Sequence, residues 1–200
     1  MKNAAHSMAT CEHGTPPEFV DVAHDVMGGI DLDPASSPTW NRFVQAKRII
    51  TAEQGFQRTP WTDGAPTILE LRTNPIEGFG EQLRVIFNPP GDKRGELVAL
   101  AWFGLTWLFR RGWVSSAIWI GFNVEQLARL QRVDAATHPL AEMTLVPPTR
   151  PNFRSEHTLK IQEDAAHAGF VTLLSRDPLE RERFAGAAGA LGYVVNGDRR

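Results

Sequence analysis

The 200-residue chain contains a single cysteine, Cys11, which excludes an internal disulfide framework and suits a reducing, cytoplasmic compartment. Charge of either sign is not in excess, because the formal net charge at pH 7 is only −2. The molecule as a whole therefore has no strong field that attracts nucleic acid, and any DNA contact has to come from a local patch. Lysine is scarce, with four of the 21 basic residues, and this arginine bias suits phosphate contacts but is also typical of a GC-rich genome.

Long hydrophobic runs are also missing. The most apolar stretch, residues 97–109, is shorter than the ~20 residues that span a bilayer, so it predicts a buried helix and no membrane partner. Residues 1–14 lack an apolar core flanked by charge, so a secretory leader is not expected. They also lack periodicity and are expected to form a flexible arm. Residues 15–200, with a soluble globular composition, are expected to form a single domain.

The spacing of apolar residues predicts helices that alternate with strands. Helices are expected from a Thr15 cap to the glycines at 28–29 and over residues 96–109, 124–132 and 179–191; strands are expected over residues 30–33, 83–87, 116–122 and 169–174. Residues 35–41 are expected to be a loop, and residues 43–50 fit either a helix or a strand. Residues 55–84 predict loops with one strand near residues 68–71. This alternation is typical of an α/β fold with a mostly parallel sheet.

The strand at residues 83–87 runs directly into Asn88-Pro89-Pro90. Two consecutive prolines end a strand abruptly, because neither has an N–H to donate to the sheet. The Asn88 amide oxygen and the Pro89 carbonyl then lie beyond the carboxyl edge of the sheet, where open α/β folds bind ligands. Such a pair can accept both hydrogens of an exocyclic amine and leave its lone pair free to attack an electrophilic methyl group. A plain turn without chemistry is the alternative interpretation.

Three short segments occur in a defined order: TPPE at residues 15–18, DLDPA at residues 31–35 and NPPG at residues 88–91. This order resembles the phage DNA N-6-adenine methyltransferase family. The similarity continues through residues 116–122 and through the PPTRPNF segment at residues 147–153. The resemblance implies a Rossmann-like fold, S-adenosyl-L-methionine (SAM) as cofactor, and methyl transfer to the N6 amine of adenine in double-stranded DNA. A phage-encoded enzyme of this kind would act in the host cytoplasm.

The resemblance also implies which residues contact the cofactor. They are Thr15, Pro16, Pro17, Asp31, Asp33, Pro34, Ala35 and Glu53. Asp33 is the better candidate for the SAM ammonium or the ribose hydroxyls, with Asp31 as a supporting partner, because Asp33 lies at the end of the strand, directly before Pro34. Glu53 could contact the ribose or the adenine, or could be a solvated loop residue. Thr15 could equally be a simple helix cap.

Catalytic and DNA-binding residues are implied in the same way. Asn88, Pro89, Pro90 and Gly91 would form the catalytic loop. A phosphate-binding rim would consist of Lys93, Arg94, Arg150 and Arg154, with Phe153 as a further DNA-binding residue. No metal site is expected, because the histidines and Cys11 near the amino terminus lack a second paired half.

Two features depart from the family pattern. Residues 36–40 contain no glycine where many methyltransferases have a glycine-rich cofactor loop, and Gly91 replaces an aromatic residue that stacks on a base swung out of the duplex. Trp61, Trp102 or Phe153 could stack on the base instead. Two alternatives therefore stay open. One is a silent methyltransferase-fold protein that binds DNA or a host partner, and the other is methylation of another amine, such as cytosine N4 or a glutamine amide.

Overall fold

The computed structural model describes residues 13–73, 81–91, 96–121, 142–146, 154–155 and 169–196, which form helices and strands in alternation. The helices are α1 (Pro17–Met27), α2 (Pro38–Val44), α3 (Ile68–Thr73), α4 (Glu96–Arg110) and α6 (Pro178–Gly189). The strands are β1 (His13–Gly14), β2 (Leu32–Asp33), β3 (Arg48–Ile49), β4 (Leu83–Phe87), β5 (Val114–Gly121), β6 (Glu142–Val146), β7 (Arg154–Ser155), β8 (Phe170–Ser175) and β9 (Tyr193–Asn196). The expected α/β class is therefore confirmed.

The main sheet has seven strands in the order β3-β2-β4-β5-β8-β6-β9. The first four strands of this order pair in parallel, whereas β8 is antiparallel to both β5 and β6, and β9 is antiparallel to β6. Most strands thus run in one direction, and the sheet is mixed at the side of β9. This arrangement is Rossmann-like.

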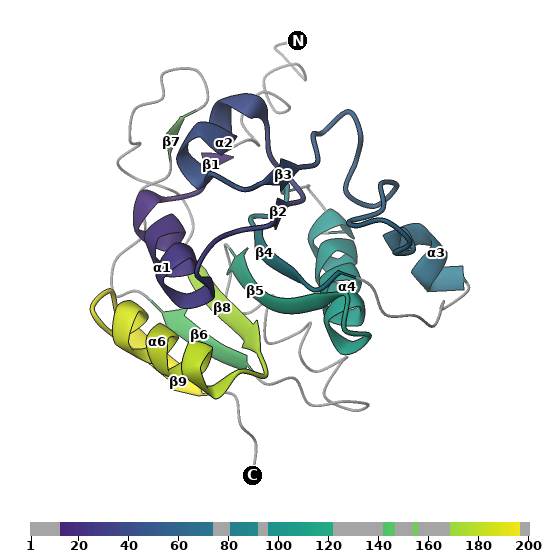
Figure 1. Cartoon of the computed structure of the whole chain (residues 1–200). Coiled ribbons are helices and arrows are strands. Elements are labelled where there is room, and N and C mark those ends of the chain that lie inside the picture. Colours follow the sequence, from purple (N-terminus) through teal and green to yellow (C-terminus); the bar gives the residue numbers. More distant parts are fainter. Residues whose placement is uncertain are drawn as a thin grey trace.

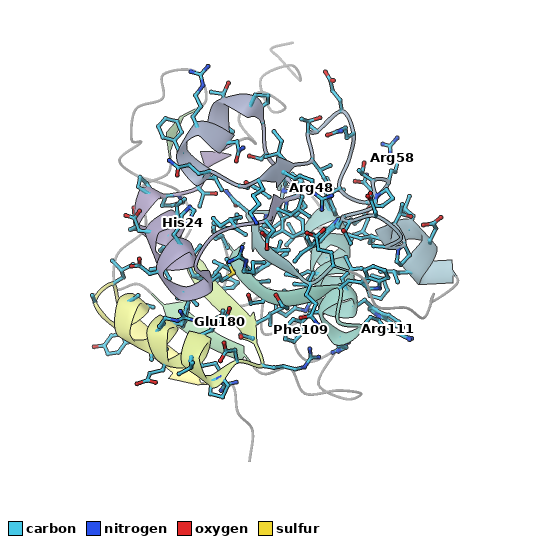
Figure 2. All side chains as sticks on the ribbon, in the orientation of Figure 1. His24, Arg48, Arg58, Phe109, Arg111 and Glu180 are labelled. Carbon is cyan, nitrogen blue, oxygen red and sulfur yellow. The ribbon has the colours of Figure 1, made fainter. Side chains whose placement is uncertain are left out.

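Helices cover both faces of the sheet (Figure 1). Strand β4 shows the alternation, because Val85 and Phe87 belong to the apolar cluster under α3 and α4, whereas Ile86 belongs to the cluster under α1 and α6. Helix α1 packs along α6 on that second face. Its histidine, His24, donates from Nε2 to the Val44 carbonyl at the end of α2, 2.9 Å away, and so ties the two helices together (Figure 2).

Several expected elements are confirmed with small shifts of their ends. Helix α1 ends at Gly28, which adopts φ 68°, a left-handed conformation that suits glycine. Its first turn differs from the expectation, because Pro16 is the N-cap residue and the helix has no side-chain cap bond, so Thr15 does not cap it. The expected helix at residues 124–132 lies outside the described residues.

Several segments differ from the predictions, among them β6 and β7, which were not predicted. Residues 35–41 were expected to be a loop, but helix α2 begins at Pro38 behind a Ser37 cap, whose hydroxyl accepts from the Trp40 N–H at 3.3 Å. Residues 68–71 form helix α3 and not a strand, because Thr67 and Glu70 cap its start reciprocally. Strand β9 was not predicted. His13 and Gly14, which were expected to belong to a flexible arm, form β1, paired with β7; residues 1–12 lie outside the described part.

Candidate functional site

A cavity of about 240 Å³ opens where β2 and β4 end. Its lining comes from three segments and from α4: Pro34, Ala35, Ser36 and Trp40; Thr51, Ala52, Gly55, Phe56 and Gln57; Asn88, Pro89 and Pro90; and Leu97. The volume is just below the range of about 300–1,000 Å³ that is typical of small-molecule sites. The cavity can therefore enclose part of a nucleotide-sized ligand.

The topology explains why this cavity lies here. The chain leaves β2 to form β3 on one side, and it later returns to form β4 on the other side of β2. Strand order reverses between β2 and β4, and the carboxyl ends of parallel strands at such a switch point leave a crevice that binds ligands in open α/β sheets. The DPA and NPP segments, 53 residues apart in the sequence, follow these two strands and so line one cavity.

A cluster of aromatic rings fixes the start of the NPP loop. Phe87, the last residue of β4, makes edge-to-face contacts with Phe56, Trp61 and Trp119, each with ring centroids 5.4 Å apart. Trp119 in turn packs edge-to-face on Trp102 at 5.2 Å. Each such pair contributes about 0.5–1.5 kcal/mol beyond the burial of its area. Asn88 therefore follows a residue that is held from three sides.

The lining segment at residues 51–57 is held by polar contacts. Arg48 extends from β3 and donates from its guanidinium to the carbonyl of Trp61 (Figure 2). The Trp61 indole N–H donates to the carbonyl of Phe56 at 3.0 Å. Gly55, with φ 73°, closes the turn by donating to the carbonyl of Thr51 at 2.9 Å. These bonds fix the segment that carries Phe56 and Gln57 into the cavity lining.

Asp33 is a buried carboxylate at the edge of the cavity. Its exposed fraction is 3%, and Pro34 and Ala35, which follow it, line the cavity. Burial raises the pKa of Asp33 to about 6, while the Ala35 N–H, 3.2 Å from Oδ1, and the Ser36 hydroxyl partly oppose that rise. Among the described residues no cationic side chain pairs with this carboxylate. Asp33 is thus suited to face a cationic group of a ligand.

Asp31, expected as a supporting partner, forms ion pairs with two cationic side chains. Its carboxylate accepts from Arg84 Nε at 2.8 Å and from Arg84 Nη2 at 2.9 Å, and Lys47 Nζ lies 2.8 Å away. Arg84 also donates to the carbonyl of Met27 at 2.9 Å. The hydrogen bonds from Arg84 hold the pKa of Asp31 well below its usual range. Asp31 therefore joins α1, β2 and β4, and it does not line the cavity.

The TPP segment lies next to the cavity without lining it. Thr15 and Pro16 are buried, and Pro17 begins α1. Their neighbour Gly14 lies against Trp40, which does line the cavity. Strand β1 pairs Gly14 with Arg154 of β7. The fold thus brings the backbone of one expected DNA-binding residue beside the expected cofactor segment.

The other predicted residues are not gathered at the cavity. Glu53 is exposed and does not line it, although its neighbour Ala52 does. Gly91 is exposed, and an added Cβ there would meet no atom within 4 Å. Trp61 and Trp102 are buried in the core, so neither can stack on a base, which corrects that expectation. The other expected rim residues, Lys93, Arg94, Arg150 and Phe153, lie outside the described residues.

Sequence reasoning missed eight residues that line the cavity, and the larger side chains among them are Trp40, Phe56 and Gln57. The pattern Ser37-Pro38, a cap residue followed by proline at the first helical position, is a signal for the helix that carries Trp40. No local signal identifies Phe56 and Gln57. They lie in a turn whose position depends on the hydrogen bond from Arg48, a residue of β3, to the Trp61 carbonyl.

The described residues contain neither a metal-binding cluster nor a helix that could cross a membrane. No group of three or more histidine, cysteine, aspartate or glutamate side chains there is arranged to hold a metal ion. No described helix combines the length and the apolar character that crossing a membrane requires. A comparison with models of known protein families finds no match for this chain, and no curated protein matches its sequence.

Proposed function

We propose that the protein is a SAM-dependent methyltransferase that modifies the N6 amine of adenine in double-stranded DNA. One observation carries the proposal: residues of the DPA and NPP segments line a single cavity at the switch point of the sheet. These segments were singled out because the first resembles a SAM loop and the second an amine-binding loop. Their convergence at one cavity is what that chemistry requires, because the methyl donor and the amine have to meet.

The residues at the cavity fit the cofactor. SAM carries an ammonium and a sulfonium, both cationic, and Asp33 offers a buried carboxylate without a cationic partner among the described residues. The lining itself holds no charged side chain, and its apolar members, among them Pro34, Ala35 and Phe56, suit the uncharged parts of a nucleoside. When bound, SAM supplies an electrophilic methyl group on sulfur.

The chain contributes positioning and two hydrogen-bond acceptors to the reaction. The side-chain oxygen of Asn88 and the main-chain carbonyl of Pro89 would accept the two hydrogens of the substrate amine, which directs the nitrogen lone pair at the methyl group. The nitrogen would bond to the methyl carbon as the carbon–sulfur bond breaks with its electron pair left on sulfur, and the methylated amine would then release one proton to water. The aromatic contacts of Phe87 keep the acceptors in place, so little reorganisation is needed at the moment of transfer.

The NPP loop recognises an amine and not a ring, so cytosine N4 or a glutamine amide is an alternative substrate. A second candidate function is a silent protein of this fold that binds DNA or a host partner. The observation that favours it is the exposed, uncovered position of Gly91, together with the burial of Trp61 and Trp102, because no stacking platform results.

A single assay separates these functions. The purified protein is incubated with methyl-labelled SAM and unmethylated duplex DNA, and the DNA is digested to nucleosides and separated by chromatography. Label in N6-methyladenine supports the proposal, and label in N4-methylcytosine supports the other amine. No label in any nucleoside, with a folded protein and several DNA substrates, contradicts both and favours the silent protein.

Asn88→Ala is the variant that tests the mechanism. We expect it to abolish methyl transfer and to leave the affinity for SAM nearly unchanged, because Asn88 would contact the amine and not the cofactor. Calorimetric titration with SAM measures the affinity, and the labelled-DNA assay measures transfer. An equal loss of both would mean that Asn88 has only a structural role.

A further inference from the structure

Trp40 lines the cavity, and its indole N–H is a buried donor without an acceptor among the described residues. Its side chain lines the cavity and has an exposed fraction of only 7%. The indole Nε1 is buried, and no acceptor for its N–H lies among the described residues. A buried tryptophan N–H usually has a hydrogen-bond partner, because leaving one unpaired costs about 1–3 kcal/mol. The missing acceptor calls for an explanation at this site.

The orientation of the ring is set by Gly14. The indole atoms Cζ3, Cε3 and Cη2 lie so close to this glycine that a Cβ on it would be 2.3 Å from Cζ3. These atoms belong to the six-membered ring, and the N–H lies on the opposite, five-membered side of the indole. On a further side, Phe43 packs against the ring with centroids 6.2 Å apart. The N–H edge is therefore turned away from β1.

The residues that line the cavity indicate which kind of ligand group could accept from the Trp40 N–H. An indole N–H is only a donor, so it requires an acceptor. None of the residues that line the cavity carries a charge, so an anionic group bound there has to rely on neutral donors, among which the Trp40 N–H is buried without an acceptor in the described part of the chain. Asp33, which is suited to a cation, immediately precedes the lining residues Pro34, Ala35 and Ser36, and the same cavity segment ends at Trp40. A buried carboxylate thus directly precedes, and an indole donor ends, one segment that contributes to the cavity lining.

An α-amino acid group carries an ammonium and a carboxylate on one carbon. The ammonium matches the Asp33 carboxylate, and the carboxylate matches the Trp40 indole N–H. We infer that Trp40 donates from its indole N–H to the α-carboxylate of the methionine end of the cofactor, while the Asp33 carboxylate faces the α-ammonium. The inference rests on the proposed function, since it assigns a part of the proposed cofactor to a residue. It adds a binding residue that the DPA, TPP and NPP segments do not include.

Two ligands separate the amino-acid end from the rest of the cofactor. S-adenosylhomocysteine has the amino-acid end and does not react, whereas 5′-methylthioadenosine keeps the nucleoside and the thioether but lacks that end. We expect Trp40→Phe to weaken S-adenosylhomocysteine binding about ten- to a hundredfold, the range for a hydrogen bond to a charged group. Binding of 5′-methylthioadenosine should change less than threefold. Calorimetric titration measures both.

Trp113→Phe is the matched control. The Trp113 indole Nε1 is also buried without an acceptor among the described residues, but Trp113 does not line the cavity. This variant should bind both ligands like the wild type. Equal weakening of both ligands by Trp40→Phe, or no weakening of either, overturns the inference and leaves the proposed cofactor intact. A wild-type protein that binds neither ligand overturns the proposed cofactor and, with it, the inference.

A spectroscopic measurement on the wild type avoids dependence on the folding of the variant. In ¹⁵N-labelled protein the chain has six indole N–H resonances, one for each tryptophan. The Trp40 resonance, assigned through its own ring and backbone, should move downfield with S-adenosylhomocysteine and stay in place with 5′-methylthioadenosine. A Trp40 resonance that responds equally to both ligands, or to neither, contradicts the inference.

Discussion

Replacing Asp33 with asparagine should make the protein more stable at neutral pH and weaken its binding of the proposed cofactor. Asparagine keeps an oxygen that can accept from the Ala35 N–H, and it removes a buried negative charge. The pKa of Asp33 rises from 3.8 to about 6 on folding. At 1.36 kcal/mol per pKa unit, ionisation of this buried group lowers the free energy of unfolding by about 3 kcal/mol.

The sign of the pH dependence follows from the raised pKa. The native state holds the Asp33 proton more tightly than the unfolded state, so the contribution of this group to stability is fully present below about pH 4. It is lost as the pH rises through about 6. The asparagine variant has no such loss. Its advantage over the wild type should therefore grow from pH 4 to pH 7.5 by about 3 kcal/mol.

Urea denaturation at the two pH values, followed by tryptophan fluorescence, measures this difference. Asp25→Asn is the control, because it removes an exposed carboxylate from α1 and changes the net charge equally. An advantage of Asp33→Asn that is the same at both pH values refutes the assignment of a buried, titrating carboxylate. Calorimetry on the same variant should show weaker binding of S-adenosylhomocysteine at pH 7.5, which would make Asp33 a group whose function costs stability.

Three further predictions concern the scaffold and the loop. Gly104→Ala should lower the free energy of unfolding by about 1–3 kcal/mol, because the new Cβ would lie 2.1 Å from Ile68 Cδ1, and this clash outweighs the higher helix propensity of alanine. In a double-mutant cycle, adding Ile68→Ala should remove most of that penalty. Asp31→Asn should destabilise by about 1–3 kcal/mol at pH 7, because the charged bonds from Arg84 are lost; in urea titrations this difference should persist down to pH 4 and shrink below it, since the folded-state pKa of Asp31 is depressed. Gly91→Phe should leave thermal stability unchanged, because the position is open, and should strengthen binding of DNA with an unpaired adenine by about 1–3 kcal/mol, measured by fluorescence anisotropy.

The local sequence determines several elements of this protein. The apolar spacing in α1 and α4 and the stop at Gly28 predict helices that the structure contains. The run of residues 83–87 followed by two prolines predicts β4 and the loop after it. These signals are short-range, since side-chain periodicity and proline chemistry act within one turn or one strand. The capping residues Thr67 and Glu70 are a signal of the same kind for α3, but the short apolar run beside them fits a strand equally well.

The candidate site, by contrast, depends on the tertiary structure. Asp31 and Asp33 are two residues apart and look alike in the sequence. Arg84, which lies more than fifty residues later, pairs with Asp31, whereas Asp33 is buried without a cation among the described residues. Trp40 reaches the cavity because the distant strands β2 and β4 end beside it, and Gly14 sets the direction of its ring. The sequence by itself determined the Asn-Pro-Pro segment and the strand that precedes it. Only the packing of distant segments decided which charge stays unpaired and which side chains share a cavity, because burial and pairing depend on neighbours that no local pattern contains.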